Sequence, residues 1–157
     1  MNIFYLHQDP ILAAKDLCDQ HILKMGIESA QMMCTAHWLT DNEAPYKKAH
    51  VNHPSTIWTR QSIYHYEWLL NHAKEIFKEY NRRYKKVHKT ESVIAWLDKN
   101  KPNIPDLAFV EPPQCMPDEY KNVDTVTAYR NFYLYDKILI KGLKYDRAEN
   151  IPNWLYS

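Results

Sequence analysis

Glycine is almost missing from this sequence, with 2 among 157 residues, although there are 9 prolines. Because glycine is the residue that adopts positive φ angles without strain, tight turns of that kind must be few. No glycine-rich phosphate loop, Walker pattern or G-x-S-x-G pattern occurs, so nucleotide hydrolysis and hydrolase-type serine chemistry have no support. The periodic stretches are instead rich in good helix formers, and loops marked by Pro and Asn separate them.

Cysteine is also scarce, and the three present are Cys18, Cys34 and Cys115. Three is an odd number, and their spacing is not that of metal ligands. We therefore predict a reduced, intracellular and cytoplasmic protein. The thiols lie among apolar residues, which does not favour a role as nucleophiles.

Histidine is more frequent, with 8 residues. The pairs His50/His53 and His65/His72 have no Cys or carboxylate at the spacing of a closed zinc site. We therefore predict no metal site, and no cofactor is signalled. His53 directly precedes Pro54, and we expect it to hydrogen-bond the loop to the helix that follows.

Neither sign of charge dominates, because the formal net charge is +1. Any binding of nucleic acid must therefore come from a local patch. No hydrophobic run approaches transmembrane length, and the short apolar start has no basic lead of the kind found in signal peptides. We predict a monomer that does not enter a membrane.

Length and periodicity predict a single, mainly α domain over residues 1–157. It should be a compact bundle of three to four helices with a long Pro-rich connection at residues 101–122. The two long helices should be antiparallel, and residues 2–6 should be extended and pin the N-terminus to the fold. The predicted helices run from Pro10, capped by Asp9, to about Leu39; from Ser55 or Thr56 to about Lys85; from a cap at Thr90 to about Asn100; and from a cap at Asp124 to Leu143.

The first long helix carries a row of polar side chains. His21, Glu28 and Thr35 are seven positions apart, and at about 100° per residue they follow one another along one helix face. Such a row can form one wall of a catalytic site, or it can be a solvated or hydrogen-bonded helix face. The opposite arc predicts an apolar stripe that packs inside, formed by Ile22, Leu23, Ile27, Ala30, Met33 and Cys34.

The only dense basic run lies at the end of the second long helix, at residues 82–89. One interpretation is a patch that contacts DNA phosphates. The other is an ordinary solvated helix end, where positive charge is favourable. The candidate phosphate contacts are Arg82, Arg83, Lys85 and Lys86.

Three short features together resemble the phage pyrimidine-dimer DNA glycosylase family, often called endonuclease V. The first is Asp19-Gln20-His21 followed seven residues later by Glu28 in the first long helix. The second is the basic end of the second long helix, and the third is the tail Pro152-Asn153-Trp154-Leu155-Tyr156. The resemblance covers about a third of the chain, and the family's members are small, single-domain, all-helical proteins.

The resemblance implies a DNA glycosylase and AP lyase that acts on double-stranded DNA with a damaged or modified base, in a bacterial or phage-infected cell. In this family the free N-terminal α-amine attacks the sugar C1′ and forms a Schiff base. The helix carboxylate, here Glu28, stabilises the developing cationic sugar and assists β-elimination. His21 would contact the substrate or orient the site.

Four further positions follow from the resemblance. Asn2 is bulky enough for Met1 to be retained, so the nucleophilic amine would belong to Met1. Gln31 stands where the family has an Arg three residues beyond the Glu, and we expect it to contact DNA. Trp154 and Tyr156 would stack on an extruded nucleotide.

Two other functions stay open. The same helical scaffold could serve a phage-type enzyme that modifies a base already extruded from the duplex. It could also be a helical binding module without enzymatic activity, whose aromatic tail engages a protein partner.

Overall fold

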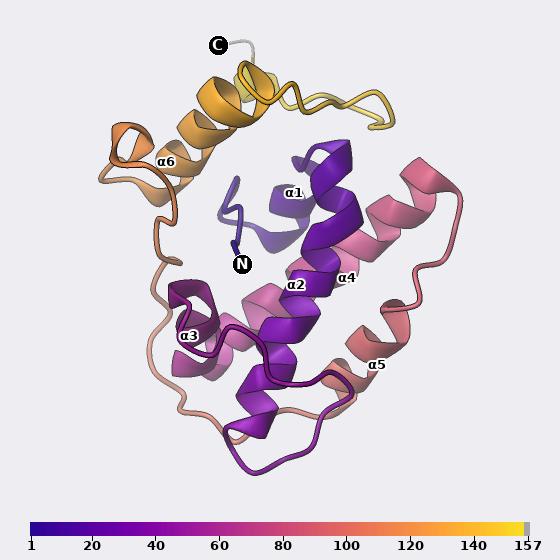
Figure 1. Ribbon diagram of the computed structural model, residues 1–157, viewed down its shortest axis with the longest axis vertical. Coiled ribbons are helices and arrows are strands. Elements are labelled where there is room, and N and C mark those ends of the chain that lie inside the picture. Colours follow the sequence, from indigo (N-terminus) through magenta and orange to yellow (C-terminus); the bar gives the residue numbers. More distant parts are fainter. Residues whose placement is uncertain (156–157) are drawn as a thin grey trace.

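Six α-helices form the body of the protein in the computed structural model, which describes residues 1–155 (Figure 1). No strand occurs within this range, so the predicted mainly α class is confirmed. None of the described helices is long and apolar enough to cross a membrane. The helices are α1 (Pro10–Lys15), α2 (Asp19–Trp38), α3 (Pro54–Gln61), α4 (Ile63–Tyr84), α5 (Glu91–Lys99) and α6 (Thr125–Phe132), with short 3₁₀ turns at Asp118–Tyr120 and Asn153–Leu155.

The helices α2 and α4 cross at the centre of the molecule and run in opposite directions (Figure 1). Their close approach depends on Gly26, which lies in the middle of α2. A Cβ atom at this position would be 2.6 Å from Cζ of Phe77 on α4, closer than real Cβ atoms come. Since Phe77 is 2% exposed, its ring has little room to move aside.

The first predicted helix is interrupted at Cys18, where the backbone is extended, so one helix from Pro10 to Leu39 is wrong. The carbonyl oxygens released by this break are bonded by Arg83 of α4. Its guanidinium donates to the oxygens of Leu17 and Lys15, at 2.6 and 3.0 Å. A side chain distant in sequence thus bonds the free carbonyl oxygens at this break, and helical periodicity could not reveal that contact.

The second predicted helix is likewise two helices, α3 and α4, divided at Ser62. This residue is extended, and its Oγ donates to the carbonyl oxygen of Leu107 at 2.5 Å. The next amide, Ile63 N, donates to Pro105 O at 2.7 Å. The break is therefore where the Pro-rich connection attaches to the helical body.

Two of the three predicted helix caps are confirmed. Asp9 Oδ1 accepts a hydrogen bond from Ile11 N at 2.8 Å, and Asp124 Oδ2 accepts one from Thr127 N at 2.9 Å. Thr90 precedes α5 as expected, but its side chain makes no capping hydrogen bond. The helix that Asp124 opens is shorter than predicted, because α6 passes into a π-helical segment at Tyr133–Ile138 and a turn before Leu143.

Burial on α2 differs from the predicted pattern. Leu23, expected inside, is 42% exposed, whereas His21 and Thr35 are 2% and 0% exposed. The polar row is therefore not a solvated face. Residues 3–6 of the N-terminal segment are also buried against the body of the fold, each at most 5% exposed.

We expect Gly26→Ala to lower the free energy of unfolding by about 1–3 kcal/mol, because the added methyl group overpacks the contact with Phe77. This cost outweighs the gain of about 1 kcal/mol that Ala brings over Gly within a helix. Urea unfolding measures the change, and Asn71→Ala on the exposed side of α4 is the control, with little expected effect. A Gly26→Ala protein more stable than the wild type would contradict the close helix contact.

Candidate active site

The amine of Met1 lies 3.2 Å from Oε1 of Glu28. The Met1 side chain is 1% exposed and that of Glu28 is 23% exposed. Met1 as a whole residue is half-buried, so its exposed surface belongs to the main chain. The buried side chain fixes residue 1 in place, while a primary amine and a carboxylate meet at a position that a ligand can reach.

The N-terminal segment reaches Glu28 because it runs along α2. The ring of Phe4 stacks on His21, with centroids 4.2 Å apart and planes 20° apart. From His21 to Glu28 a helix rises about 10 Å, and three residues of extended chain from Phe4 to Met1 span about the same length. Two turns of helix and three residues of extended chain therefore bring the amine to the carboxylate.

His21 does not make a direct contact with the amine. Its Nδ1 lies 2.6 Å from the hydroxyl of Tyr133, and its ring is buried beneath Phe4. Burial above all, and then the positive charges of Lys24 and Lys137, lower the pKa of His21 to about 3. Its imidazole is therefore neutral near pH 7, and it supports the N-terminal segment through its contact with the ring of Phe4.

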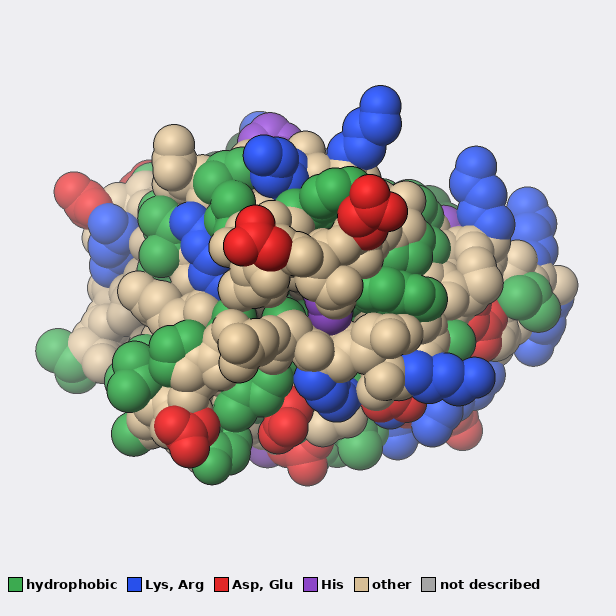
Figure 2. Space-filling view, turned by 90° about the horizontal axis from the view of Figure 1, so that it is seen from below, with side chains coloured by type: hydrophobic (Ala, Val, Ile, Leu, Met, Phe, Trp, Pro, Cys, Tyr) green, Lys and Arg blue, Asp and Glu red, His purple; other side chains and the backbone are tan. Residues whose placement is uncertain are grey.

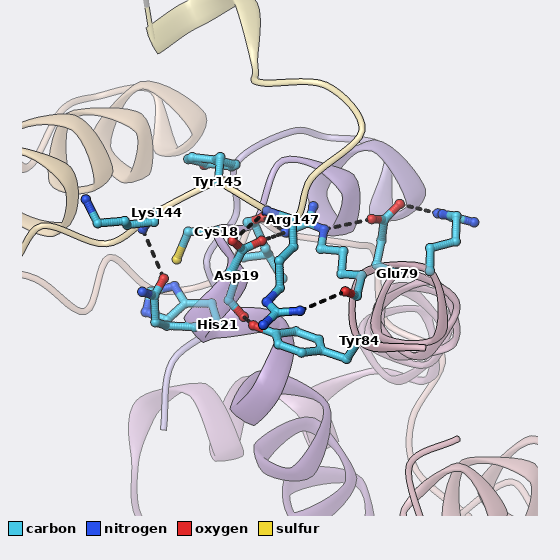
Figure 3. Close-up of polar contacts among 12 residues, drawn as sticks. Cys18, Asp19, His21, Glu79, Tyr84, Lys144, Tyr145 and Arg147 are labelled. Carbon is cyan, nitrogen blue, oxygen red and sulfur yellow. Dashed lines mark hydrogen bonds and ion pairs between the residues drawn. The ribbon is translucent and has the colours of Figure 1, made fainter. Parts of the chain in front are cut away.

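The other two residues of the Asp-Gln-His motif hold the C-terminal segment against α2 (Figure 3). Asp19 Oδ1 pairs with Arg83 Nη1 at 3.3 Å, and Asp19 Oδ2 accepts from Arg147 N at 2.9 Å. Gln20 Oε1 accepts from Lys144 N at 3.0 Å. The motif thus has a structural explanation that the sequence did not reveal.

The basic run at residues 82–89 separates into two kinds of side chain. Arg83 is 5% exposed and pairs with Glu79 at 3.0 Å in addition to its contacts at the α1–α2 break. Arg82 also pairs with Glu79, at the rim of the same cluster. Lys85 and Lys86 are exposed, and no ion pair involves them within residues 1–155. Of the four predicted phosphate contacts, Lys85 and Lys86 are the two that make no ion pair within residues 1–155.

The remaining predicted positions on α2 lie beyond Glu28. Gln31 is half-buried and one turn further along the helix. Thr35 is buried, and its hydroxyl oxygen accepts a hydrogen bond from Ala49 N at 3.1 Å. Thr35 therefore ties the loop after α2 to the helix and does not face the site.

The aromatic tail lies against the α1–α2 break. Trp154 Nε1 donates to Asp16 Oδ2 at 3.0 Å, and the guanidinium of Arg130 lies 5.3 Å from the centre of its ring. Trp154 is half-buried. Tyr156, the other predicted stacking residue, lies outside the described residues.

A cationic cleft of about 350 Å³ opens beside the first turns of α2. Lys24, one turn before Glu28, faces Lys137 and Lys141 from the C-terminal segment. Sequence reasoning missed this cleft because its walls are more than 100 positions apart, although the i, i+4 spacing of the latter two lysines was a usable signal. The lining is Gln20, His21, Lys24, Lys137, Lys141 and Leu143.

The loop before α3 brings a histidine to the site. His53 Nδ1 accepts a hydrogen bond from Ser55 N at 3.1 Å, which confirms the predicted link between loop and helix. Burial lowers the pKa of His53, and the positive charges of the Met1 amine and His50 lower it further. The carboxylate of Glu28 acts in the opposite direction. His53 therefore interacts electrostatically with both Met1 and Glu28. Sequence reasoning did not predict this interaction.

Charge elsewhere is mixed. Figure 2 shows one end of the molecule, where basic, acidic and apolar side chains alternate without a field of one sign. Within residues 1–155, no three His, Cys, Asp or Glu side chains are grouped so as to hold a metal ion. The chemistry that this site offers is that of an amine, a carboxylate and an imidazole.

Comparison with models of known protein families gives a match. The model of a family described as pyrimidine dimer DNA glycosylase matches residues 1–92, more than half of the 157 residues. The matched part contains Met1, Glu28 and His53 and reaches the start of α5. No curated protein and no solved structure gives a significant match.

We expect Arg83→Met to lower the free energy of unfolding by about 3–5 kcal/mol, because it leaves the buried Asp19 without a cation and leaves Glu79 with Arg82 alone. Arg82→Met is the matched control. Its side chain is 44% exposed, and we expect a loss of at most about 1 kcal/mol. Urea unfolding measures both changes. An Arg83→Met protein of unchanged stability but weakened DNA binding would instead support the phosphate contact predicted for Arg83.

Proposed function

The chain belongs to the pyrimidine dimer DNA glycosylase family, and from this premise we propose that it cleaves the glycosidic bond of a damaged pyrimidine through the Met1 amine, held by Glu28. The observation that carries the proposal is the 3.2 Å contact between the amine and Oε1 of Glu28. A primary amine is the group that can form a Schiff base with a sugar carbon. DNA glycosylase function follows from the family, whereas the roles of individual residues are our proposal.

The unprotonated amine of Met1 attacks C1′ of a nucleotide extruded from the duplex. A bond from nitrogen to C1′ forms as the bond from C1′ to the base breaks, and the base departs with the electron pair. Opening of the sugar ring moves a proton from the nitrogen to O4′ and leaves a Schiff base. Loss of a C2′ proton then expels the 3′ phosphate and cuts the strand.

Glu28 has two tasks in this sequence. Its carboxylate holds the amine in position before attack, which removes much of the entropic cost of bringing the two reactants together. It also places negative charge beside the sugar as positive charge develops there. Its partly exposed side chain leaves room for the sugar to approach.

The DNA backbone is proposed to follow the positive side chains around this site. The cleft formed by Lys24, Lys137 and Lys141 begins one turn from Glu28 on α2. Lys85 and Lys86 are exposed at the end of α4 and extend the positive surface. Phosphate contacts of this kind position the duplex without reading its sequence. Gln31 is proposed to contact the nucleotide beyond Glu28, and Trp154 to stack beside it.

The ion pair between Met1 and Glu28 also helps to distinguish between the alternative functions. A base-modifying enzyme or a protein-binding module gives no reason to hold the terminal amine against a carboxylate at an accessible site. A lyase requires this arrangement. The geometry therefore favours the glycosylase and lyase over both alternatives.

We expect the wild-type protein to be trapped covalently by borohydride on duplex DNA that carries a cyclobutane pyrimidine dimer or an abasic site. Acetylation of the N-terminal amine should abolish the adduct. Glu28→Gln should slow strand cleavage by at least about 100-fold, because the carboxylate acts on the charged transition state. Gel analysis of single-turnover reactions measures both effects.

Glu67→Gln, an exposed position on α4, is the control and should leave trapping and cleavage unchanged. A wild-type protein that forms no adduct on either DNA would refute the proposed chemistry. A change in nucleoside mass without strand cleavage would point to a base-modifying enzyme. Tight DNA binding without any reaction would point to a binding module.

The positive surface is tested separately by the salt dependence of DNA binding. If Lys85 and Lys86 each contact a phosphate, the double Ala variant should reduce the slope of log K against log salt concentration by about 2. Lys78→Ala with Lys99→Ala, two exposed lysines of α4 and α5, provides the matched control. An unchanged slope for the first double variant would exclude both residues from the interface.

A further inference from the structure

The loop that carries His53 is fixed on both sides. Ala49 is bonded to Thr35 of α2, and the guanidinium of Arg60 on α3 donates to Val51 O at 2.8 Å. His53 itself begins α3 through its Nδ1 contact with Ser55 N. The ring therefore has a defined orientation before any ligand binds.

The start of the chain is tied to the same place. Asn2 Nδ2 donates to the carbonyl oxygen of Cys115 at 2.9 Å, and the thiol of Cys115 lies 3.6 Å from Oγ of Ser55. Residue 2 and residue 55 are thus linked through one partner. This linkage brings the start of α3 close to the start of the chain, and His53 has charge interactions with the Met1 amine and with Glu28.

The contact with Ser55 also settles which ring nitrogen carries the proton. Because Nδ1 accepts a hydrogen bond from a backbone N–H, the neutral imidazole has its proton on Nε2. Within residues 1–155, His53 Nε2 has no hydrogen-bond partner. His53 is therefore a donor with one free N–H, and its ring has charge interactions with the Met1 amine and Glu28.

Two polar atoms nearby in sequence are likewise unsatisfied. Asn2 Oδ1 and Thr56 Oγ1 are both buried without a hydrogen-bond partner in the described part of the chain. Buried polar atoms of folded proteins normally have a partner. One belongs to the neighbour of Met1 and the other to the first turn of α3, which His53 begins.

We propose that His53 is a catalytic residue of the glycosylase step, in which its Nε2–H donates a hydrogen bond to the departing pyrimidine. This inference rests on the function proposed above. As the bond from C1′ to N1 breaks, the electron pair leaves with the base, and the charge spreads to the carbonyl oxygen O2 beside N1. The N–H of His53 stabilises that charge without transferring its proton, and the base later takes a proton from water.

A neutral donor suits this task. Burial and the nearby positive groups lower the pKa of His53, so the imidazole stays uncharged near neutral pH and does not compete with the Met1 amine for Glu28. The groups that face it are the Met1 amine, Glu28 and His50. A fixed donor aimed at a developing negative charge lowers a barrier more than a mobile one, because it needs no reorganisation.

Cleavage of the glycosidic bond and cleavage of the strand make different demands on His53. Cleavage of the glycosidic bond requires stabilisation of the leaving base. Strand cleavage at an abasic site does not, because no base is present. A residue that serves the leaving base must therefore affect the first reaction and spare the second.

The experiment compares single-turnover reactions on two otherwise identical duplexes, one with a cyclobutane pyrimidine dimer and one with an abasic site. His53→Asn keeps a cap for α3, because Asn accepts the same backbone hydrogen bond, but it loses the N–H at the Nε2 position. We expect glycosidic cleavage at the dimer to slow by about 100-fold, with cleavage at the abasic site within about threefold of wild type.

A second variant tests the donor directly. His53→Gln places an amide N–H near the former Nε2 position and should recover part of the rate on the dimer, although it caps α3 less well. Glu67→Gln, at an exposed position on α4, is the control and should react like wild type on both duplexes. Thermal unfolding of each variant reports whether the fold is retained.

The outcomes are distinct. Equal loss on both duplexes, or no loss on either, would overturn the assignment of His53, even if the Met1 amine is the nucleophile. A wild-type protein that cleaves neither duplex would overturn the proposed function and this inference with it. Slower cleavage of the dimer alone, with partial recovery by Gln, is the result that the structure leads us to expect.

Discussion

The buried guanidinium of Arg83 is the contact on which the arrangement of this fold depends. It lies between the carboxylates of Asp19 and Glu79, and all three residues are at most 6% exposed. Buried charges are stable only when they are paired and hydrogen-bonded, so this cluster forces the end of α4 against the start of α2. The same guanidinium bonds the end of α1, and Asp19 also bonds the backbone of Arg147 in the C-terminal segment. The start of α2 is thereby fixed, and this also fixes the position of every residue along the axis of that helix.

The site depends on this position because the N-terminal segment is aligned with α2. Phe4 is held against His21, which is in turn held by Tyr133. Shifting α2 by one turn would move Glu28 by about 5 Å and separate it from the Met1 amine. The Asp-Gln-His motif thus fixes the position of α2, while Glu28 contacts the Met1 amine. The result is a buried structural layer beneath a small reactive surface formed by chain segments that are distant in sequence.

Helical class, the caps at Asp9 and Asp124, and the alignment of Glu28 with the start of the chain were within reach of the sequence. They depend on local patterns or on a short motif with a known family behind it. The breaks at Cys18 and Ser62 could not be predicted from the sequence. The backbone groups that these breaks leave free are bonded by Arg83 and by the backbone of the Pro-rich connection, both distant in sequence. For the same reason the basic run was treated as one patch, although Arg83 is buried and Arg82, Lys85 and Lys86 are exposed. His53 was recognised as the residue that links the loop to the next helix, but nothing local shows that it interacts with the charges of Met1 and Glu28.

The register of the first residues adds a constraint on how the amine can act. Each extended residue advances about 3.3–3.6 Å, and Phe4 is anchored, so the residue opposite Glu28 is determined by counting back from the anchor. If Met1 were removed, the terminal amine would belong to Asn2 and would lie one residue further from Glu28. The buried space that the Met1 side chain fills would then be empty. Asn2 could not compensate, because its side chain is bonded to Cys115. A residue added before Met1 would carry the amine beyond the carboxylate. The same side chain that packs residue 1 into the core therefore also selects which amine meets Glu28, and stability and reactivity depend on the same few residues of the N-terminal segment.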